Sequence, residues 1–120
     1  KDLDKKSRRF LAQFGQFLID HETSWAELRV EGHTDSRGSI SYNEKLSFDR
    51  AASVREALIG VGVKTAKIIA KGFGPKEPVD TSNTPAAWAK NRRVEMRFSG
   101  VSDPEDFASR LREFRQTRSY

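Results

Sequence analysis

Apolar residues recur every three or four positions near the start of the chain, which is typical of a helix with one buried face. The positions that make this stripe are Phe10, Leu11, Phe14, Phe17 and Leu18. They predict an amphipathic helix over about residues 3–19, and the polar residues 20–24 predict a connection after it. Residues 25–31 alternate between apolar and polar, so we predict a strand there with Leu28 and Val30 on one face.

A second helical stripe follows a polar stretch and consists of Ser47, Ala51, Val54 and Leu58. The helix that carries it is predicted to begin near residues 42–43. It is predicted to end at residues 60–62, where glycine can take the left-handed conformation that stops a helix. Residues 66–73 are β-branched enough to predict a second strand. Residues 74–91 hold three of the four prolines and predict a long loop with one helical turn at 85–88.

The last part of the chain predicts a third strand and a final helix. Residues 92–98 alternate, with Val94, Met96 and Phe98 inward. The outward positions of this strand are Arg93, Glu95 and Arg97. Asp103 as N-cap and Pro104 as first helical residue predict a helix over about 103–118. Its apolar stripe is Phe107, Leu111 and Phe114. This order of elements predicts an α/β sandwich with helices packed on one face of a small mixed sheet.

The composition is that of a globular chain of 120 residues, and we expect residues 1–120 to form a single domain. There are no cysteines, which excludes disulfides and thiolate metal sites and fits either the cytosol or a periplasm. No stretch approaches the roughly 20 apolar residues that cross a bilayer. A start at Lys1 suggests a fragment of a longer protein, so any anchor or targeting signal is expected upstream.

The net charge of +5 is compatible with an anionic partner such as nucleic acid, anionic lipid or a cell-wall polymer. The basic residues are spread among acidic ones, and no run of lysines and arginines occurs. A solvated surface therefore explains the charge better than a nucleic-acid interface does.

Candidate chemistry is concentrated in residues 31–50, EGHTDSRGSISYNEKLSFDR. Asp35 follows the carboxyl end of the first strand, and Asn43, Leu46 and Arg50 fall within an arc of roughly 60° on the helix that comes next. The corner between them offers an acceptor for an ammonium group, a planar fork for a carboxylate and an apolar floor. The simpler alternative is that Asp35 and Arg50 pair with each other while Asn43 caps the helix.

Catalysis and metal binding have little support in these residues. His33 and Asp35 are too few for zinc, and the other histidine, His21, lies in a polar turn. No serine lies in a nucleophile-elbow pattern, and residues 72–74 lack the further glycine of a dinucleotide loop. A hydrolase acting on the wall would need a second carboxylate or a metal near Asp35, for which Glu31 and Glu44 are the candidates. We expect no catalytic residue, no metal and no cofactor.

Three runs in this order closely resemble the OmpA-like peptidoglycan-binding domain: GHTDSRGSISYNEKLSFDRAASVREALIGVGV, GFGPKEP and NRRVE. Outer-membrane protein A, the Pal lipoprotein and the MotB stator subunits share this domain. The resemblance covers about residues 25–98 and implies a βαβαββ core. Because this chain starts almost at the first helix, the first strand is expected to be upstream, truncated or absent.

The helix after Gly100 lies beyond the shared core. Its basic positions are Arg110, Arg112, Arg115 and Arg118. They could serve a partner or a dimer contact, but solubility is the first explanation.

The resemblance implies a site for meso-diaminopimelate in the stem peptide of the wall. Asp35 would receive its free amino group, and Arg50 would bind the carboxylate at the same end. Tyr42 and Asn43 match the YN pair of the family and would shape the pocket with Leu46. A lysine-type wall lacks that carboxylate and would leave Arg50 unpaired.

Three further residues complete the site that the resemblance implies. Thr34 and the adjoining loop backbone would add hydrogen bonds. Arg92 and Arg93 match the NRRV motif, in which one arginine supports the site and the other faces outward. The motif alone does not say which is which.

The resemblance implies non-catalytic anchoring of a larger protein to peptidoglycan. A MotB-like stator is favoured over a Pal-like or porin-like outer-membrane tether by the preceding amphipathic helix and by the absence of a lipid-attachment cysteine. The SISYNEKLSFDR stretch is also similar to the stator subunits of Zorya anti-phage motors. A stator would be a homodimer that contacts membrane motor subunits through its missing N-terminal part. The domain would then be the periplasmic part of an inner-membrane-anchored protein. A nucleic-acid-binding module, whose binding falls steeply with salt, is the alternative from another class.

Overall fold

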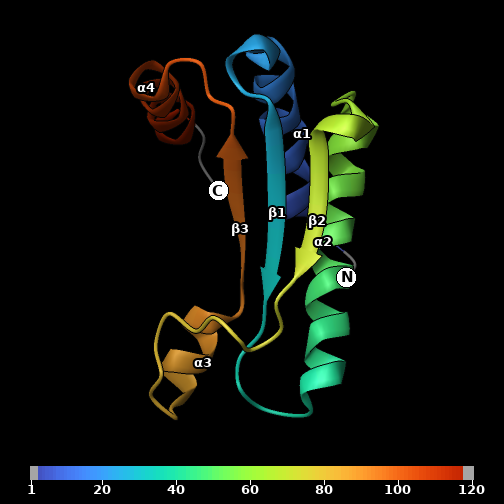
Figure 1. Cartoon of the computed structure of the whole chain (residues 1–120), viewed down its shortest axis with the longest axis vertical. Helices are drawn as coiled ribbons and strands as arrows, with labels where there is room; N and C mark the ends of the chain where they lie inside the picture. The colour runs from blue at the N-terminus through green and yellow to red at the C-terminus, as the bar shows by residue number, and fades with distance from the viewer. Residues whose placement is uncertain (1–2, 118–120) are drawn as a thin grey trace.

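The computed structural model describes residues 3–117, which form four α-helices and three strands (Figure 1). Their bounds are α1 Lys5–Asp20, β1 Glu27–His33, α2 Ile40–Val61, β2 Ile68–Gly72, α3 Pro85–Asn91, β3 Arg93–Ser99 and α4 Pro104–Gln116. Two short 3-10 helices, η1 Glu22–Ser24 and η2 Thr65–Lys67, precede β1 and β2. None of the helices formed by residues 3–117 combines the length and the apolar character that crossing a membrane requires.

The three strands form one mixed sheet in the order β2-β1-β3. β1 pairs with β2 in parallel and with β3 antiparallel, with Val30 opposite Ala70 on one side and opposite Met96 on the other. α1 and α2 lie side by side behind the sheet in Figure 1. The predicted α/β sandwich with helices on one face of a small mixed sheet is therefore confirmed. Within residues 3–117 no strand precedes α1, so β3 is an edge strand of the described sheet.

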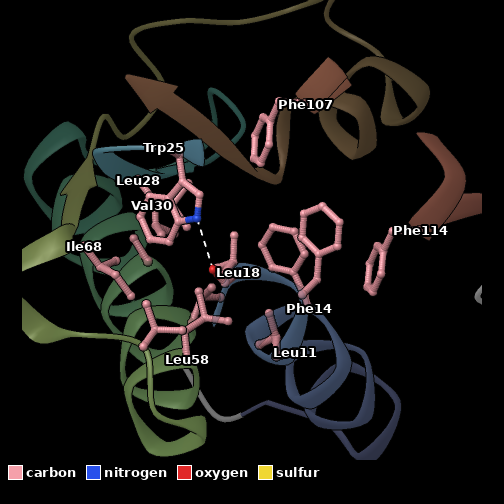
Figure 2. Packing of buried hydrophobic residues seen from close by; sticks show 14 residues of the cluster. Leu11, Phe14, Leu18, Trp25, Leu28, Val30, Leu58, Ile68, Phe107 and Phe114 are labelled. Carbon is pink, nitrogen blue, oxygen red and sulfur yellow. Dashed lines mark hydrogen bonds between the residues drawn. The ribbon is translucent and has the colours of Figure 1, made fainter. Parts of the chain in front are cut away.

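The core lies between the sheet and α1 and α2 (Figure 2). Leu18 of α1, Leu28 of β1 and Leu58 of α2 are fully buried. Nε1 of Trp25 donates to the carbonyl oxygen of Leu18 over 3.1 Å, which fastens the start of the first strand region to the end of α1. The predicted stripe of α2 is confirmed, because all of its members are buried: Ser47, Ala51, Val54 and Leu58.

The predicted last helix is α4, and it packs through aromatic rings. Phe107 lies edge-on against Phe98 of β3, and Phe114 packs against Phe17 of α1 with ring centroids 5.1 Å apart. The side chain of Asp103 accepts from the backbone N–H of Asp106, and a proline follows the cap, as predicted. Of the basic positions named for this helix, Arg118 lies outside the described residues.

Some boundaries differ from the prediction. β1 continues to His33 rather than ending near residue 31, because Gly32 and His33 still pair with Val94 and Arg93 of β3. α2 begins at Ile40, because Ser39 is its N-cap and accepts from the N–H of Tyr42.

The structure also differs from the prediction at α3 and β3. The helical turn predicted at 85–88 continues to Asn91 as α3, with Thr84 as its cap. Val94, predicted to be inward, faces the helix side but is 36% exposed, because α1 leaves a groove of about 410 Å³ beside the edge strand.

Candidate functional site

The close approach of α2 to β1 brings the candidate residues together. Gly32 lies against the backbone of Ser47, and a Cβ atom at this position would overlap the carbonyl oxygen of Ser47. Thr34 follows β1 and donates its N–H to the carbonyl of Gly74 over 3.0 Å, so the loop after β2 holds the residue before Asp35. The acid at the end of β1 therefore faces the first turns of α2.

An open pocket of about 370 Å³ lies at this corner of the fold. Its lining comes from the end of β1, the loop after it, α2 and the residue before β3: Thr34, Asp35, Arg37, Gly38, Asn43, Leu46, Arg50 and Arg92. Of the eight residues that the sequence predicted for the site, six are brought together here, while Tyr42 and Arg93 do not line the pocket.

Asp35 is buried and carries a full set of hydrogen bonds. Its Oδ1 accepts from the backbone N–H and from Nε of Arg37, at 2.9 and 3.1 Å. Its Oδ2 accepts from Nη2 of Arg37 at 2.8 Å and from Nη1 of Arg92 at 2.9 Å. The hydrogen bonds from the Arg37 side chain are the main reason why the pKa of Asp35 lies far below its usual range. The same contact raises the pKa of Arg37.

Arg50 of α2 lines the same pocket. Among residues 3–117 it has no ion pair and no side-chain hydrogen bond, although the acid is in the same pocket. The alternative that Asp35 and Arg50 pair with each other is therefore wrong. The proposed cap role of Asn43 is also wrong, because its Nδ2 instead donates to the carbonyl of Arg37 over 2.6 Å. Arg50 is thus available to an anion from outside.

The two residues that miss the pocket have other environments. Tyr42 is on the outer side of α2 and 64% exposed. Arg93 pairs with Glu95 and donates to the carbonyl oxygens of Asn91 and Glu77 at 3.1 and 2.9 Å. Arg92 is thus the arginine of the NRRV motif that reaches the pocket, and Arg93 fastens the long loop to β3.

Sequence reasoning missed two residues that matter to this corner. Arg37 binds Asp35 and lies over the ring of Trp88, with its guanidinium carbon 4.3 Å from the ring centroid. Asn91 is buried, accepts from the N–H groups of Val79 and Asp80, and donates to the carbonyl of Asp80. The available signals were the position of Arg37 two residues after an aspartate, which suits a turn, and the place of Asn91 at the head of the NRRV motif.

The face of the sheet that α1 and α2 do not cover is called the open face. It holds a cluster of Glu31, His33 and Glu95 whose possible ligand atoms lie within 4.8 Å of one another. Glu31 is 1% exposed and bound by Nε of Arg29 at 2.8 Å and Nε of Arg97 at 3.0 Å. Glu95 pairs with Arg97 and with Arg93. Because guanidinium groups already occupy both carboxylates, the cluster is poorly suited to a metal cation.

The same contacts bear on hydrolysis. Glu31 is neutralised on the open face of the sheet by two arginines, and Glu44 is paired with Lys76. Neither of the acids considered as a second carboxylate is therefore free to act with Asp35. Within residues 3–117 the pocket combines the carboxylate of Asp35 with the guanidinium groups of arginines, an arrangement that can bind oppositely charged groups.

The chain is similar to known proteins over most of its length. The model of the OmpA family matches residues 1–92. Outer membrane porin F of Pseudomonas fluorescens is 47% identical over 68 residues, which are 57% of this chain and 21% of the porin. The chain spans 19% of the outer membrane porin F of Pseudomonas aeruginosa and 54% of the outer-membrane lipoprotein YfiB of the same organism.

Two solved structures show the same fold. The peptidoglycan-associated lipoprotein of Burkholderia pseudomallei is 33% identical with a TM-score of 0.74, over 82% of this chain and 81% of that one. The C-terminal domain of Helicobacter pylori MotB is 20% identical with a TM-score of 0.83, over 98% of this chain and 90% of that one. By its match to the family model and its likeness to this lipoprotein, the chain belongs to the OmpA family.

Proposed function

We propose that this domain binds peptidoglycan without catalysis, through the meso-diaminopimelate of the stem peptide. The observation that carries the proposal is that two groups of opposite charge line one pocket. Asp35 supplies a buried carboxylate, and Arg50 supplies a guanidinium that has no partner within the described residues. The free end of diaminopimelate has an ammonium and a carboxylate on one carbon, so it can meet both groups at once.

The energetics suit selective binding. A hydrogen bond to a charged group contributes roughly 1.5–3 kcal/mol to the free energy of binding. Two such contacts, at Asp35 and Arg50, would therefore contribute more than one ion pair on an exposed surface. A lysine side chain at the same place of the stem peptide has the ammonium but not the carboxylate, and Arg50 would remain unsatisfied. We therefore propose that the domain prefers walls of the diaminopimelate type.

The remaining pocket residues would shape and hold the site. Leu46 would form the apolar floor, and Thr34 would support the loop at the rim. Asn43 would fix the loop through the carbonyl of Arg37, and Arg92 would orient Asp35. Tyr42 would act only at the edge, because its ring is turned to solvent.

We infer that wall binding anchors a larger protein, with this domain in the periplasm. Its identity is 36% to a peptidoglycan-associated lipoprotein and 48% to an outer membrane porin, which supports a tether of the Pal type. The MotB domain shares the fold at 20% identity, so the stator role, the homodimer, the contact with membrane motor subunits, the inner-membrane anchor and the anti-phage setting stay predictions.

The test is sedimentation with purified sacculi of the diaminopimelate type and of the lysine type, each at two salt concentrations. The unmodified chain should pellet with the first wall, and Asp35→Ala and Arg50→Ala should each abolish this. Arg110→Ala is the matched control, because it removes one positive charge from α4, which Figure 1 shows at the opposite end of β3 from α3.

Two results would contradict the proposal. Equal binding to both walls would show that the distal carboxylate of diaminopimelate does not contribute to recognition. Binding that falls steeply with salt and ignores both pocket substitutions would favour a general attraction to anions, including nucleic acid.

A further inference from the structure

The carboxylate that would receive the ligand's ammonium is already saturated. A carboxylate offers about four lone-pair sites, and Asp35 uses four: three for Arg37 and one for Arg92. An ammonium group that enters this pocket therefore finds no free acceptor on Asp35 until one of these donors leaves.

Charge leads to the same conclusion. The pocket brings one carboxylate, Asp35, together with three guanidinium groups, those of Arg37, Arg50 and Arg92. These charges attract the carboxylate of a ligand. The ammonium group of the same ligand would add a fourth positive charge beside a single carboxylate of the protein. Entry of the ammonium becomes favourable only if a cation moves away at the same time.

The side chain of Arg37 is the donor that can leave. Its backbone is fixed at both ends, since its N–H bonds Asp35 and its carbonyl accepts from Asn43. Its side chain is 56% exposed, so the guanidinium can return to water without movement of the loop. In the free protein the guanidinium carbon also lies 4.3 Å from the centroid of the Trp88 ring, so the group that leaves Asp35 gives up this contact as well. Its departure frees one site on each oxygen of Asp35.

We propose that Arg37 is a built-in competitor for the ligand's ammonium group, which occupies the acceptor sites of Asp35 in the free protein and is displaced on binding. The inference rests on the proposed function, because it assigns the ammonium to Asp35. It follows that the free protein lowers its own affinity for any ligand with an ammonium at this place. A ligand with the carboxylate alone binds Arg50 without displacing Arg37.

The test measures the affinity of soluble stem tripeptides by calorimetry. One peptide carries meso-diaminopimelate, and a second carries 2-aminopimelate, which keeps the distal carboxylate but lacks the amine. Arg37→Ala removes the competing cation, and Arg37→Met removes the charge while it keeps an apolar chain over Trp88. Both should bind the first peptide about fivefold more tightly than the unmodified chain, which is the strength of an exposed ion pair. Neither should bind the second peptide more tightly.

A second readout observes the displacement itself. In the unmodified chain the Nε–H of Arg37 donates to Asp35, so its NMR signal should be protected from exchange and should lose this protection when the first peptide is added. Arg110→Ala is the control for general charge and should leave both affinities unchanged.

The outcomes separate the two proposals. If Asp35→Ala abolishes binding but neither Arg37 variant binds more tightly, or if both bind more weakly, Arg37 is not a competitor and the proposed function still holds. If Asp35→Ala binds the first peptide as well as the unmodified chain does, the proposed function fails and this inference fails with it.

Discussion

Arg92 lies 57 positions after Asp35 in the sequence, and its Nη1 donates to Oδ2 of Asp35 over 2.9 Å. The contact joins the residue before β3 to the second residue after β1, at the end of the sheet where the pocket opens. The position of the acid is therefore set from two sides, by its own loop and by the third strand.

This contact predicts different roles for the two arginines of the NRRV motif. Arg92→Ala should weaken binding to sacculi of the diaminopimelate type, because Oδ2 of Asp35 loses the one of its two donors that comes from outside its own loop. Its effect on the free energy of unfolding should stay within about 1 kcal/mol, since the side chain is 41% exposed. Arg93→Ala should leave wall binding nearly unchanged but lower stability, because it holds the long loop. Sedimentation and urea unfolding of both variants measure this, and reversed effects would contradict it.

The acid should also be visible in the pH dependence of stability. The pKa of Asp35 is lowered in the folded state, chiefly by Arg37, so the unfolded chain takes up the proton first as the pH falls. The stabilisation is then fully present above the unfolded pKa of about 3.9 and is lost as the pH falls below it. Asp35→Asn should be less stable than the unmodified chain at neutral pH, with a gap that narrows below about pH 4. Thermal unfolding from pH 7 to pH 2 tests this, and a constant gap would contradict it.

The sequence predicted the elements well because their signals are local. Helical stripes such as Ser47 to Leu58 and the Asp103 cap depend on residues within a few positions of each other. The start of α2 was placed too late, because the polar residues before Tyr42 gave no apolar period, while the true signal was the cap at Ser39. Val94 was placed correctly on the helix side, but its exposure depends on how far α1 covers the edge strand.

Six of the eight predicted residues line the pocket, whereas Arg37, which also lines it, was missed. How the charged groups of the pocket pair was not predictable. Asp35 and Arg50 were identified from their places after a strand and along a helix. Which arginine binds Asp35 depends on distances between segments that no sequence period reports. Arg92 arrives from 57 positions away, and Arg37 folds back within a turn.

Gly32 lies where α2 approaches β1 closely, whereas Gly60 of α2 faces open space. Alanine substitutions at these two glycines therefore form a matched pair of variants. In Gly32→Ala the new Cβ would overlap the carbonyl oxygen of Ser47 and lie 2.8 Å from its carbonyl carbon. We expect a loss of about 3 kcal/mol in the free energy of unfolding, as in an overpacked core. Gly60→Ala on α2 meets nothing within 4 Å and should stabilise by about 0.5–1 kcal/mol, because alanine favours a helix. Urea midpoints measure both, and similar changes in the two variants would contradict the prediction.

Asn91 should hold the long loop through its amide. Asn91→Ala removes two hydrogen bonds to the N–H groups of Val79 and Asp80 and one to the carbonyl of Asp80, so we expect a loss of about 2 kcal/mol. Limited proteolysis should also cut faster within residues 74–84. The control is Lys90→Ala, whose ion pair with Asp80 spans 3.5 Å on the surface and should matter little. Equal cutting of both variants would show that the amide does not hold the loop.

His33 gives a prediction on the open face of the sheet. It is 1% exposed, its ring is stacked on Phe73 with centroids 5.3 Å apart, and burial lowers the pKa of the imidazole. The folded protein therefore holds His33 neutral, while the unfolded chain takes up a proton below about pH 6.5, so stability should fall as the pH drops below that value. The NMR titration of the imidazole signals should place the midpoint of His33 below 6.5. A midpoint above it would mean that the neighbouring Glu31 outweighs burial, since a nearby carboxylate favours the charged ring.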